Sequence, residues 1–238
     1  MIYEERFITK WHDTSLDRDV RPGAVLTYFQ ETANLQLEHQ GMSLDRLRDE
    51  RGLAFILSRI CIRFYKPLPA YAPVIAQTWV CPSHAFTFPR CYRLLTQKGE
   101  TVAEAGSVWA LLRLRDRSFV RVDEFTYPVE SDEPLDELTD HRIRIPKEPY
   151  EPAGQRQIFR SECDYNMHMN NTRYPDMLTD FLPDTGERRI RQMTIAFRNE
   201  RALGHTLTIS RAAGADGNSF WLRGEDDGKI CFDSEILL

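Results

Sequence analysis

Apolar positions in the first half of the chain follow two different periods. Within residues 24–40 they recur at steps of three and four, at Leu26, Phe29, Ala33 and Leu37. This spacing predicts an amphipathic helix, and Gly41 is a suitable residue to end it. Strand-like runs separated by short turns follow at residues 53–65, 72–81, 86–97, 101–115 and 118–122. Because short turns join antiparallel strands, we predict a helix packed on an antiparallel sheet.

Residues 123–154 break this pattern. They contain five prolines, and ten acidic residues stand against three basic ones. Prolines favour an extended backbone, and a high density of charge resists burial. We therefore predict an acidic, proline-rich linker over these residues.

Residues 155–238 repeat the order of elements seen in the first half. We predict a strand at 155–160, a turn at Asp164 and a helix at 170–181. Further strands are expected at residues 190–198, 206–211, 219–224 and 229–237. The segments Ile62-Arg63-Phe64 and Ile195-Ala196-Phe197 also match, at a constant offset of 133.

The repeat predicts two copies of one α+β fold, at residues 1–122 and 155–238, with the linker between them. In each copy a strand comes first, then a long helix, then an antiparallel sheet. This order suggests a sheet wrapped around a long central helix, the hotdog arrangement. The expected fold is therefore a tandem double hotdog.

The composition narrows the function classes. A formal net charge of -5 argues against wholesale nucleic-acid binding, which needs an excess of basic residues. The five cysteines are scattered and none forms a C-x-x-C pair, so we expect neither a disulfide framework nor a zinc site. The first fifteen residues lack the apolar core of a signal peptide, and no apolar run is long enough to span a bilayer. We therefore expect a cytoplasmic protein with no membrane span.

The clearest functional signal is a difference in polarity between the two copies. Asp19 and Asp164 each precede a tyrosine at similar spacing, which aligns them. The first copy continues with valine, arginine and proline, whereas the second places Asn166 and His168 at alternate positions. In an extended segment, Asp164, Asn166 and His168 would share one face, where a carboxylate and an amide can orient an imidazole. We therefore expect the working site in the second copy.

The two copies also differ in polarity at the end of a predicted strand. The constant offset places Glu200 opposite Pro67, and Asn199 opposite Lys66. With His168 nearby, Glu200 would complete a set consisting of a base or nucleophile, a histidine that moves a proton, and donors for an oxyanion. Such a set can activate water or a thioester carbonyl. We also expect a backbone N–H at the start of the Asn170 helix to serve as an oxyanion donor.

Each of these residues also has a structural interpretation. Asn170 is a suitable helix cap, a histidine in a turn is commonly solvated, and a lone glutamate is typical of an exposed strand end. Cys163 and Cys231 are expected to act as small buried apolar groups. Several aromatic side chains fit either a core or the wall of an acyl pocket: Trp79, Trp109, Phe86 and Phe88. The other histidines have no partners at metal-ligand spacing, so no metal is expected.

Several segments together resemble the acyl-ACP thioesterase family, the acyl-acyl carrier protein hydrolases of plants and bacteria. The stretch RSECDYNMHMNNTRYPDML resembles the second-hotdog signature, in which an acid, N-x-H-x-N-N and then a tyrosine open the helix. FRNE resembles the segment of the catalytic glutamate. LTYFQETA, LSRICIRFYKPLPAYAPVIAQTWV and SVWALL resemble the first hotdog. The resemblance extends over nearly the whole chain.

The resemblance implies hydrolysis of fatty acyl-ACP to a free fatty acid and the carrier, which terminates fatty acid synthesis, with no metal or organic cofactor. It implies an acyl pocket in the first hotdog and the catalytic set Asp164, Asn166, His168 and Glu200. Plant members commonly have a cysteine directly after the glutamate, but this chain has Arg201, so a cysteine nucleophile is not expected. Plant members also carry a transit peptide, so the resemblance points to a bacterial cytosolic form.

Two rival functions stay open at this point. An acyl-CoA thioesterase would share the fold and the chemistry. A non-enzymatic acyl-thioester-binding protein would keep the pocket but would need neither His168 nor Glu200, and the polar set argues against it. Whether Glu200 acts as a base or as a nucleophile also stays open.

The expected partner is an acidic acyl carrier protein. The acidic excess of the chain belongs mostly to the linker, since residues 1–122 contribute +4, residues 123–154 contribute -7 and residues 155–238 contribute -2. Two basic clusters are candidate docking surfaces, although each also fits an ordinary solvated face: Arg113, Arg115 and Arg117 along a predicted strand, and Arg188, Arg189 and Arg191. A homodimer is an open alternative to a monomer.

Overall fold

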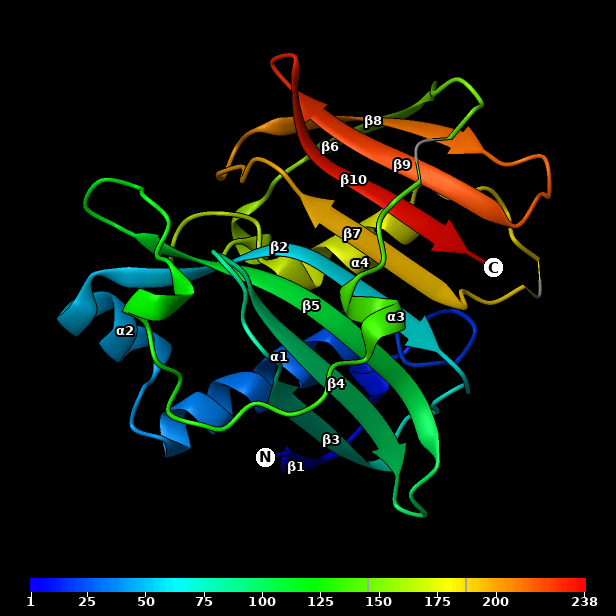
Figure 1. The fold of residues 1–238 in the computed structure, drawn as a ribbon. Helices are drawn as coiled ribbons and strands as arrows, with labels where there is room; N and C mark the ends of the chain where they lie inside the picture. Colours follow the sequence, from blue (N-terminus) through cyan, green and yellow to red (C-terminus); the bar gives the residue numbers. More distant parts are fainter. Residues whose placement is uncertain (145, 187) are drawn as a thin grey trace. The chain divides into compact units, whose positions relative to one another are not determined.

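The computed structural model of the chain describes residues 1–144, 146–186 and 188–238. These residues divide into two compact units, Met1–His141 and Arg142–Leu238 (Figure 1). The boundary falls within the segment predicted as a linker, so residues 123–141 belong to the first unit and the described residues of 142–154 to the second. Each unit combines helices with antiparallel strands, which confirms the predicted α+β class.

The first unit contains an antiparallel sheet. Its strands, in spatial order, are β1 (Tyr3–Ile8), β3 (Pro73–Val80), β4 (Phe88–Thr96), β5 (Thr101–Arg113) and β2 (Leu53–Phe64). The predicted strand at 118–122 is wrong, because this stretch makes only an isolated bridge between Phe119 and Leu112. After it the chain turns away from the sheet: Val120 packs into a core cluster with Phe88, and a 3₁₀ turn, η2 (Val122–Glu124), follows.

Helix α1 (Pro22–His39) is the long central helix of the first unit. Its apolar stripe packs on the sheet, and Phe29 stacks on Tyr92 of β4 with 5.1 Å between the ring centroids. Pro22 occupies the first turn, where a missing backbone N–H costs nothing. A shorter helix, α2 (Leu44–Arg51), follows and ends at Gly52 with a left-handed φ of 63°.

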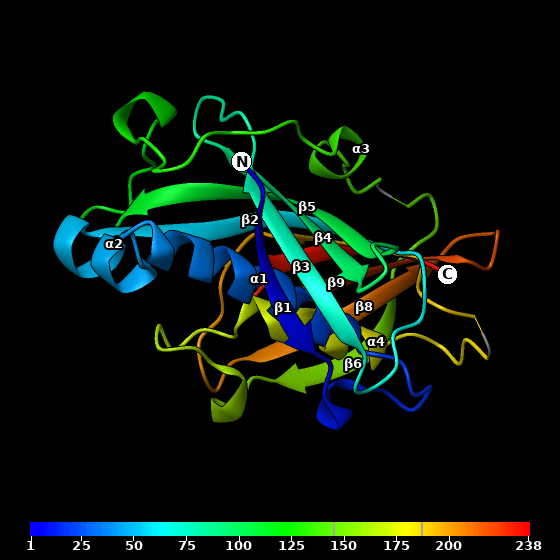
Figure 2. The ribbon, with the colours of Figure 1, turned by 90° about the horizontal axis from the view of Figure 1, so that it is seen from below.

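Helix α3 (Asp136–Thr139) lies on the face of this sheet opposite α1 (Figure 2). Gly106 of β5 permits its close approach, because a Cβ atom there would lie 2.5 Å from the backbone nitrogen of Thr139. Leu138 is buried, and Arg59 donates a hydrogen bond to the carbonyl of Thr139 at 2.7 Å. This part of the predicted linker is therefore packed on the first unit rather than extended in solvent.

The second unit contains another antiparallel sheet. Its strands, in spatial order, are β7 (Gln192–Phe197), β10 (Lys229–Leu237), β9 (Ser219–Asp226), β8 (Thr206–Ala213) and β6 (Glu151–Gln157). Alternate residues of these strands form the core, with Met193, Ile195, Leu207, Ile209, Leu222 and Ile236 all buried. The ring of Tyr174 packs edge-on against Phe197 and Phe232, with centroids 5.0 and 5.5 Å away.

The helix of the second unit is shorter than the predicted span of 170–181. A 3₁₀ turn, η4 (Asn171–Arg173), precedes α4 (Tyr174–Thr179). Pro175 explains the later start, because a residue without a backbone N–H fits the first turn of a helix and not its interior. The expectation of a long central helix in each half is thus met by α1 and not by α4.

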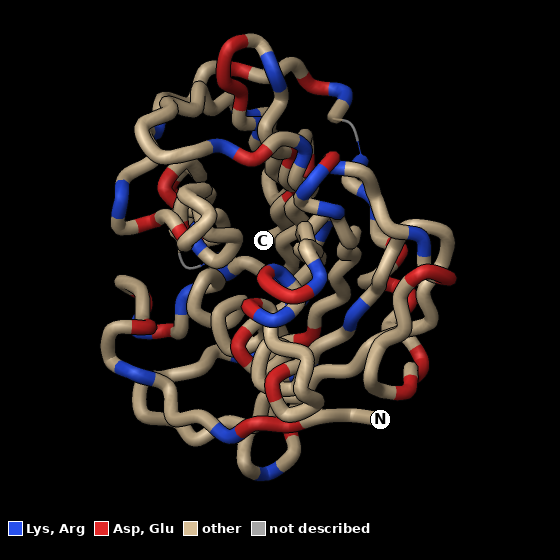
Figure 3. Tube along the Cα trace, turned by 90° about the vertical axis from the view of Figure 1, so that its left-hand side faces the viewer, with Lys and Arg blue, Asp and Glu red and all other residues tan. Residues whose placement is uncertain are grey.

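None of the helices in the described residues is both long and apolar enough to cross a membrane. All five cysteines are free thiols. Basic and acidic residues are interspersed along the chain trace (Figure 3).

Candidate active site

The predicted site residues Asp164, Asn166 and His168 lie on one tight turn. The backbone nitrogen of Asp164 donates to the carbonyl of His168 at 3.0 Å, and that of Met167 donates to the carbonyl of Asp164 at 3.0 Å. Met167 has a left-handed φ of 65°. The prediction of an extended segment with three side chains on one face is therefore wrong.

The cause is a local hydrogen bond of Asp164. Its Oδ1 accepts from the backbone nitrogen of Asn166 at 2.8 Å, the Asx turn that aspartate forms readily. The carboxylate is thus engaged with the backbone of its own turn. Asp164 shapes the loop that presents His168, and the hydrogen bonds that locate His168 come from the backbone.

The backbone around His168 is tied to the segment that follows Glu200. His168 forms an isolated bridge with Ala202. On either side, Met169 donates to the carbonyl of Arg201 at 3.1 Å, and Leu203 donates to the carbonyl of Met167 at 3.0 Å. These non-local hydrogen bonds bring together two stretches more than thirty residues apart in the sequence.

As a result, the imidazole of His168 and the carboxylate of Glu200 meet. His168 Nδ1 lies 3.5 Å from Glu200 Oε2, and the two side chains are 34% and 45% exposed. This separation is longer than a tight hydrogen bond. Both groups can reach a substrate from solvent, and together they can accept and donate a proton.

The same turn occurs in the first unit, and it corrects the predicted alignment of the copies. Ser15 donates to the carbonyl of Asp19 at 2.8 Å, and its Oγ accepts from the backbone nitrogen of Asp17 at 3.3 Å. Arg18 has a φ of 61°. Ser15 therefore corresponds to Asp164, and Asp19 corresponds to His168. The alignment of Asp19 with Asp164 is wrong because the spacing to the following tyrosine differs between the copies.

The alignment of Pro67 with Glu200 is confirmed by backbone hydrogen bonds. Val20 donates to the carbonyl of Leu68 at 2.8 Å, just as Met169 donates to that of Arg201. The residues that precede the two acceptors are Pro67 and Glu200. The first copy thus has an aspartate and a proline where the second has an imidazole and a carboxylate.

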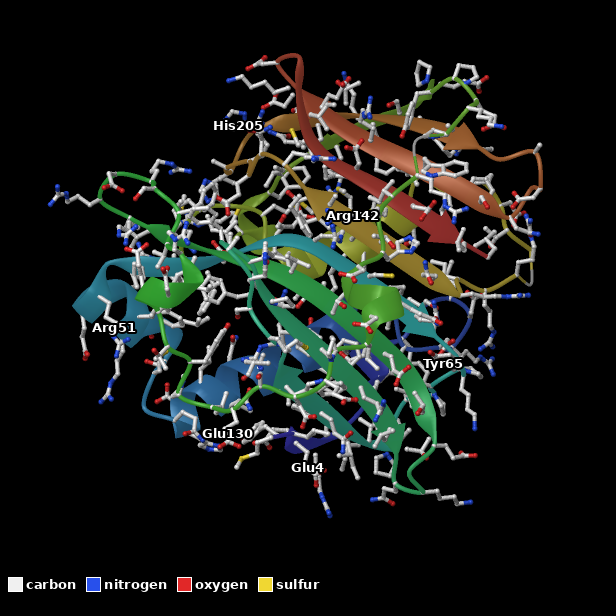
Figure 4. All side chains as sticks on the ribbon, viewed as in Figure 1. Glu4, Arg51, Tyr65, Glu130, Arg142 and His205 are labelled. Atoms are coloured by element: carbon white, nitrogen blue, oxygen red, sulfur yellow. The ribbon has the colours of Figure 1, made fainter. Side chains whose placement is uncertain are left out.

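The structure contains a second imidazole–carboxylate pair that the sequence analysis did not identify. His205 (Figure 4) lies with its Nδ1 2.7 Å from Asp226 Oδ2. Arg201 Nε lies 2.9 Å from the same oxygen, so the charge of Asp226 is already balanced. No sequence spacing relates Asp226 to His205; they meet because the β9–β10 turn lies beside the segment after Glu200. The guanidinium of Arg201 serves this ion pair.

Tyr174 is another residue that the sequence analysis did not assign to the site. It is buried, and burial raises the pKa of its hydroxyl well above the ordinary value, with a further contribution from the charge of Glu200. The phenol is therefore neutral near neutral pH. Asn170 Oδ1 accepts from Thr172 N at 2.9 Å, which confirms its capping role, and that N–H is not free for an oxyanion.

The cysteines near the site are not activated as nucleophiles. The expectation of a buried group is wrong for Cys163, which is only half-buried. Partial loss of hydration raises the pKa of its thiol, and the carboxylates of Asp164 and Glu162 raise it further. Burial likewise raises the pKa of the Cys231 thiol. Both thiols are thus protonated near neutral pH, and a protonated thiol is a weak nucleophile. Among the residues that the structure describes, no cluster of His, Cys, Asp and Glu is arranged to hold a metal ion.

Replacing Cys163 with serine should leave hydrolytic turnover within a few-fold of the wild type, because a protonated thiol contributes no nucleophile. The measurement is the steady-state rate of thioester hydrolysis, with thermal melting as a check on the fold. Cys231→Ser, a substitution at a buried position, serves as the companion variant. A loss of a hundredfold or more in folded Cys163→Ser protein would show that the thiol takes part in the reaction.

Comparisons with known proteins agree on one family. Residues 1–128 match the family model described as "Acyl-ACP thioesterase N-terminal domain", and residues 154–231 match "Acyl-ACP thioesterase C-terminal domain". The chain is 24% identical to oleoyl-acyl carrier protein thioesterase 2, chloroplastic, of Arabidopsis thaliana, over 83% of this chain and 59% of that protein. It is 23% identical to palmitoyl-acyl carrier protein thioesterase, chloroplastic, of the same plant, over 91% and 56%. The chain thus spans a little over half the length of these two relatives.

Solved structures support the fold. An acyl-ACP thioesterase from Bacteroides thetaiotaomicron superposes with a TM-score of 0.87 at 21% identity, over 99% of this chain and 97% of that one. The 12:0-ACP thioesterase from Umbellularia californica gives a TM-score of 0.81 at 17% identity, over 99% and 96%. The predicted hotdog fold is confirmed by this similarity.

Proposed function

The chain belongs to the acyl-ACP thioesterase family, and from this membership we propose that it hydrolyses fatty acyl-acyl carrier protein to a free fatty acid and the carrier. This reaction ends the growth of the fatty acid. The contact between His168 and Glu200 carries the proposal, since it lies within the residues that match the C-terminal domain of the family and supplies the groups that the chemistry requires.

Glu200 and His168 share the proton transfers of this mechanism. Glu200 takes a proton from water, and the water oxygen attacks the thioester carbonyl. The C–S bond then breaks, and protonated His168 gives its proton to the departing sulfur. A transfer from Glu200 to His168, 3.5 Å away, restores both groups. One water and one thioester thus yield one acid and one thiol.

A second route uses the same two residues. The carboxylate of Glu200 attacks the thioester carbonyl and expels the thiol, leaving a mixed anhydride that water then hydrolyses. The products and the proton balance are the same. In both routes we assign Asn166, which is exposed on the turn, to hydrogen-bonding the thioester oxygen, and Asp164 to holding the turn that carries Asn166 and His168.

The proposed partner is an acidic acyl carrier protein, and the proposed location is the cytoplasm. The structure gives little support to the two basic clusters as docking surfaces for the carrier protein. Arg113 is paired with Glu124, and Arg117 lies in a turn with a φ of 60° rather than along a strand. Arg188 donates to the carbonyl of Gly217 at 2.6 Å.

The experiment is a hydrolysis panel with purified protein. Saturated and monounsaturated acyl-ACPs of several chain lengths are assayed in parallel with the matching acyl-CoAs, and Glu200→Ala protein is the control. Release of free fatty acid from acyl-ACP at a higher kcat/KM than from acyl-CoA is the expected result. Preference for acyl-CoA would favour the rival thioesterase, and binding without hydrolysis would favour a non-enzymatic acyl-binding protein.

A further inference from the structure

A groove of about 590 Å³ crosses the second unit, apart from the His168–Glu200 contact. One wall is the segment that leads into β6, which contributes Ile143, Arg144, Pro146 and Tyr150. The other wall is built by β7, β9 and β10 and the residues next to them. Its size falls in the range of small-molecule sites, roughly 300–1,000 Å³.

The lining of this groove is strongly basic. Its charged residues are Arg144, Arg198, Arg223, Lys229 and Asp233, which gives four cations and one carboxylate. Asp233 is buried and its two oxygens are already engaged, with Arg223 Nε at 2.8 Å and Arg198 Nε at 3.4 Å. Among the described residues, no carboxylate lies within ion-pair distance of Arg144 or Lys229. The described lining of the groove therefore carries an excess of positive charge.

Part of this basic wall is held rigidly. The guanidinium of Arg223 lies over the ring of Tyr150, 4.8 Å from its centroid, while Asp233 holds its Nε. A side chain fixed on two sides loses little conformational entropy when it binds an anion. Arg144 and Lys229 are exposed and complete the cationic lining.

The groove lining includes the residue that precedes the proposed catalytic carboxylate. Asn199 lines the groove and donates through Nδ2 to the carbonyl of Ile230 at 2.7 Å. Glu200 is the next residue in the chain. Part of the basic groove lining thus belongs to the same segment after β7 that carries the proposed catalytic carboxylate.

We propose that the groove binds the phosphate of the phosphopantetheine arm that presents the acyl thioester, an inference that rests on the proposed function. The arm is long and neutral except for its phosphate, and the thioester sulfur is at the opposite end. Guanidinium and ammonium groups form charge-assisted hydrogen bonds with phosphate oxygens. The acyl carrier protein and coenzyme A share this phosphate.

The test uses two small substrates that differ only in that phosphate, S-acyl-phosphopantetheine and S-acyl-pantetheine. Wild-type protein should hydrolyse the phosphorylated substrate with a kcat/KM about tenfold higher, the effect of one charge-assisted contact worth about 1.4 kcal/mol. The double variant Arg144→Gln/Lys229→Gln should lose that advantage, mainly through KM, and should hydrolyse S-acyl-pantetheine at the wild-type rate. The double variant should also have a lower kcat/KM than the wild type with acyl-ACP or acyl-CoA, whichever of the two the wild type hydrolyses faster.

A matched control variant removes one arginine charge and one lysine charge at positions outside the groove. Arg51→Gln/Lys98→Gln changes an exposed arginine on α2 (Figure 4) and an exposed lysine in the first unit, and it should keep the phosphate preference. The phosphate site would be overturned if the wild type hydrolysed the two small substrates at equal rates. It would also be overturned if Arg144→Gln/Lys229→Gln lost the same share of kcat/KM on both substrates. Either result would leave the proposed function standing. Loss with acyl-ACP but not with S-acyl-phosphopantetheine would overturn it in favour of docking of the carrier's protein surface. Absence of hydrolysis of every thioester would overturn the proposed function itself.

Discussion

Replacing Glu200 with glutamine is expected to lower the turnover of acyl-ACP by about 10²–10⁴-fold, because an amide neither takes a proton from water nor attacks a carbonyl. The substitution keeps the size and shape of the side chain. Glu200 is 45% exposed, and a surface substitution of this kind changes the free energy of unfolding by roughly 0.5 kcal/mol or less. The measurement is release of free thiol by purified protein, together with its thermal melting curve.

The matched control for this variant is Glu151→Gln, which makes the same chemical change at an exposed position of β6. We expect it to retain turnover within a few-fold of the wild type. If folded Glu200→Gln protein hydrolyses acyl-ACP as fast as the control, Glu200 is neither base nor nucleophile. The assignment of the site would then be lost, whatever the family.

Replacing His168 with alanine is expected to lower turnover to a similar extent, about 10²–10⁴-fold, because the departing sulfur loses its proton donor. The fold should survive, since the hydrogen bonds that hold this turn come from the backbone of Asp164, Met167 and Met169 rather than from the imidazole. The double variant His168→Ala/Glu200→Gln should be little slower than either single variant, because residues that act as a unit have non-additive effects. Single-turnover rates on acyl-ACP measure this directly.

His205 offers a matched control within the same unit. Its imidazole also contacts a carboxylate, Asp226, but that carboxylate is balanced by Arg201. His205→Ala should therefore keep turnover within a few-fold of the wild type. If His205→Ala and His168→Ala lose activity equally, or if the double variant multiplies the two single losses, the pairing of His168 with Glu200 would not explain the chemistry.

The local pattern of the sequence was sufficient for much of the fold. The apolar spacing predicted a helix at 24–40, and α1 spans Pro22–His39. Strands β2 to β5 and β7 to β10 lie within or close to the predicted runs, because period-two alternation and turn residues are local properties. One failure was local in origin, because Pro175 delayed the start of the second helix. The other came from tertiary packing, because Val120 leaves the sheet for a core cluster with Phe88.

For the candidate site, too, the sequence predicted some features and missed others. The imidazole of the second copy and the offset to Pro67 were enough to select His168 and Glu200 as candidates. They were not enough to orient Asp164, whose carboxylate hydrogen-bonds its own turn instead of the imidazole. Nor did they reveal that Asp19 corresponds to His168 rather than to Asp164, because spacing to the following tyrosine is not preserved between the copies.

By itself, then, the sequence determined which residue types are available, including an imidazole and a carboxylate where the first copy has an aspartate and a proline. The tertiary structure alone decided which of them meet. His168 and Glu200 are neighbours because backbone hydrogen bonds join the turn at 164–168 to the segment at 201–203, and Asp226 reaches His205 and Arg201 through a hairpin. Such contacts depend on how distant segments pair, and pairing is set by the packing of whole sheets rather than by the spacing of residues along the chain.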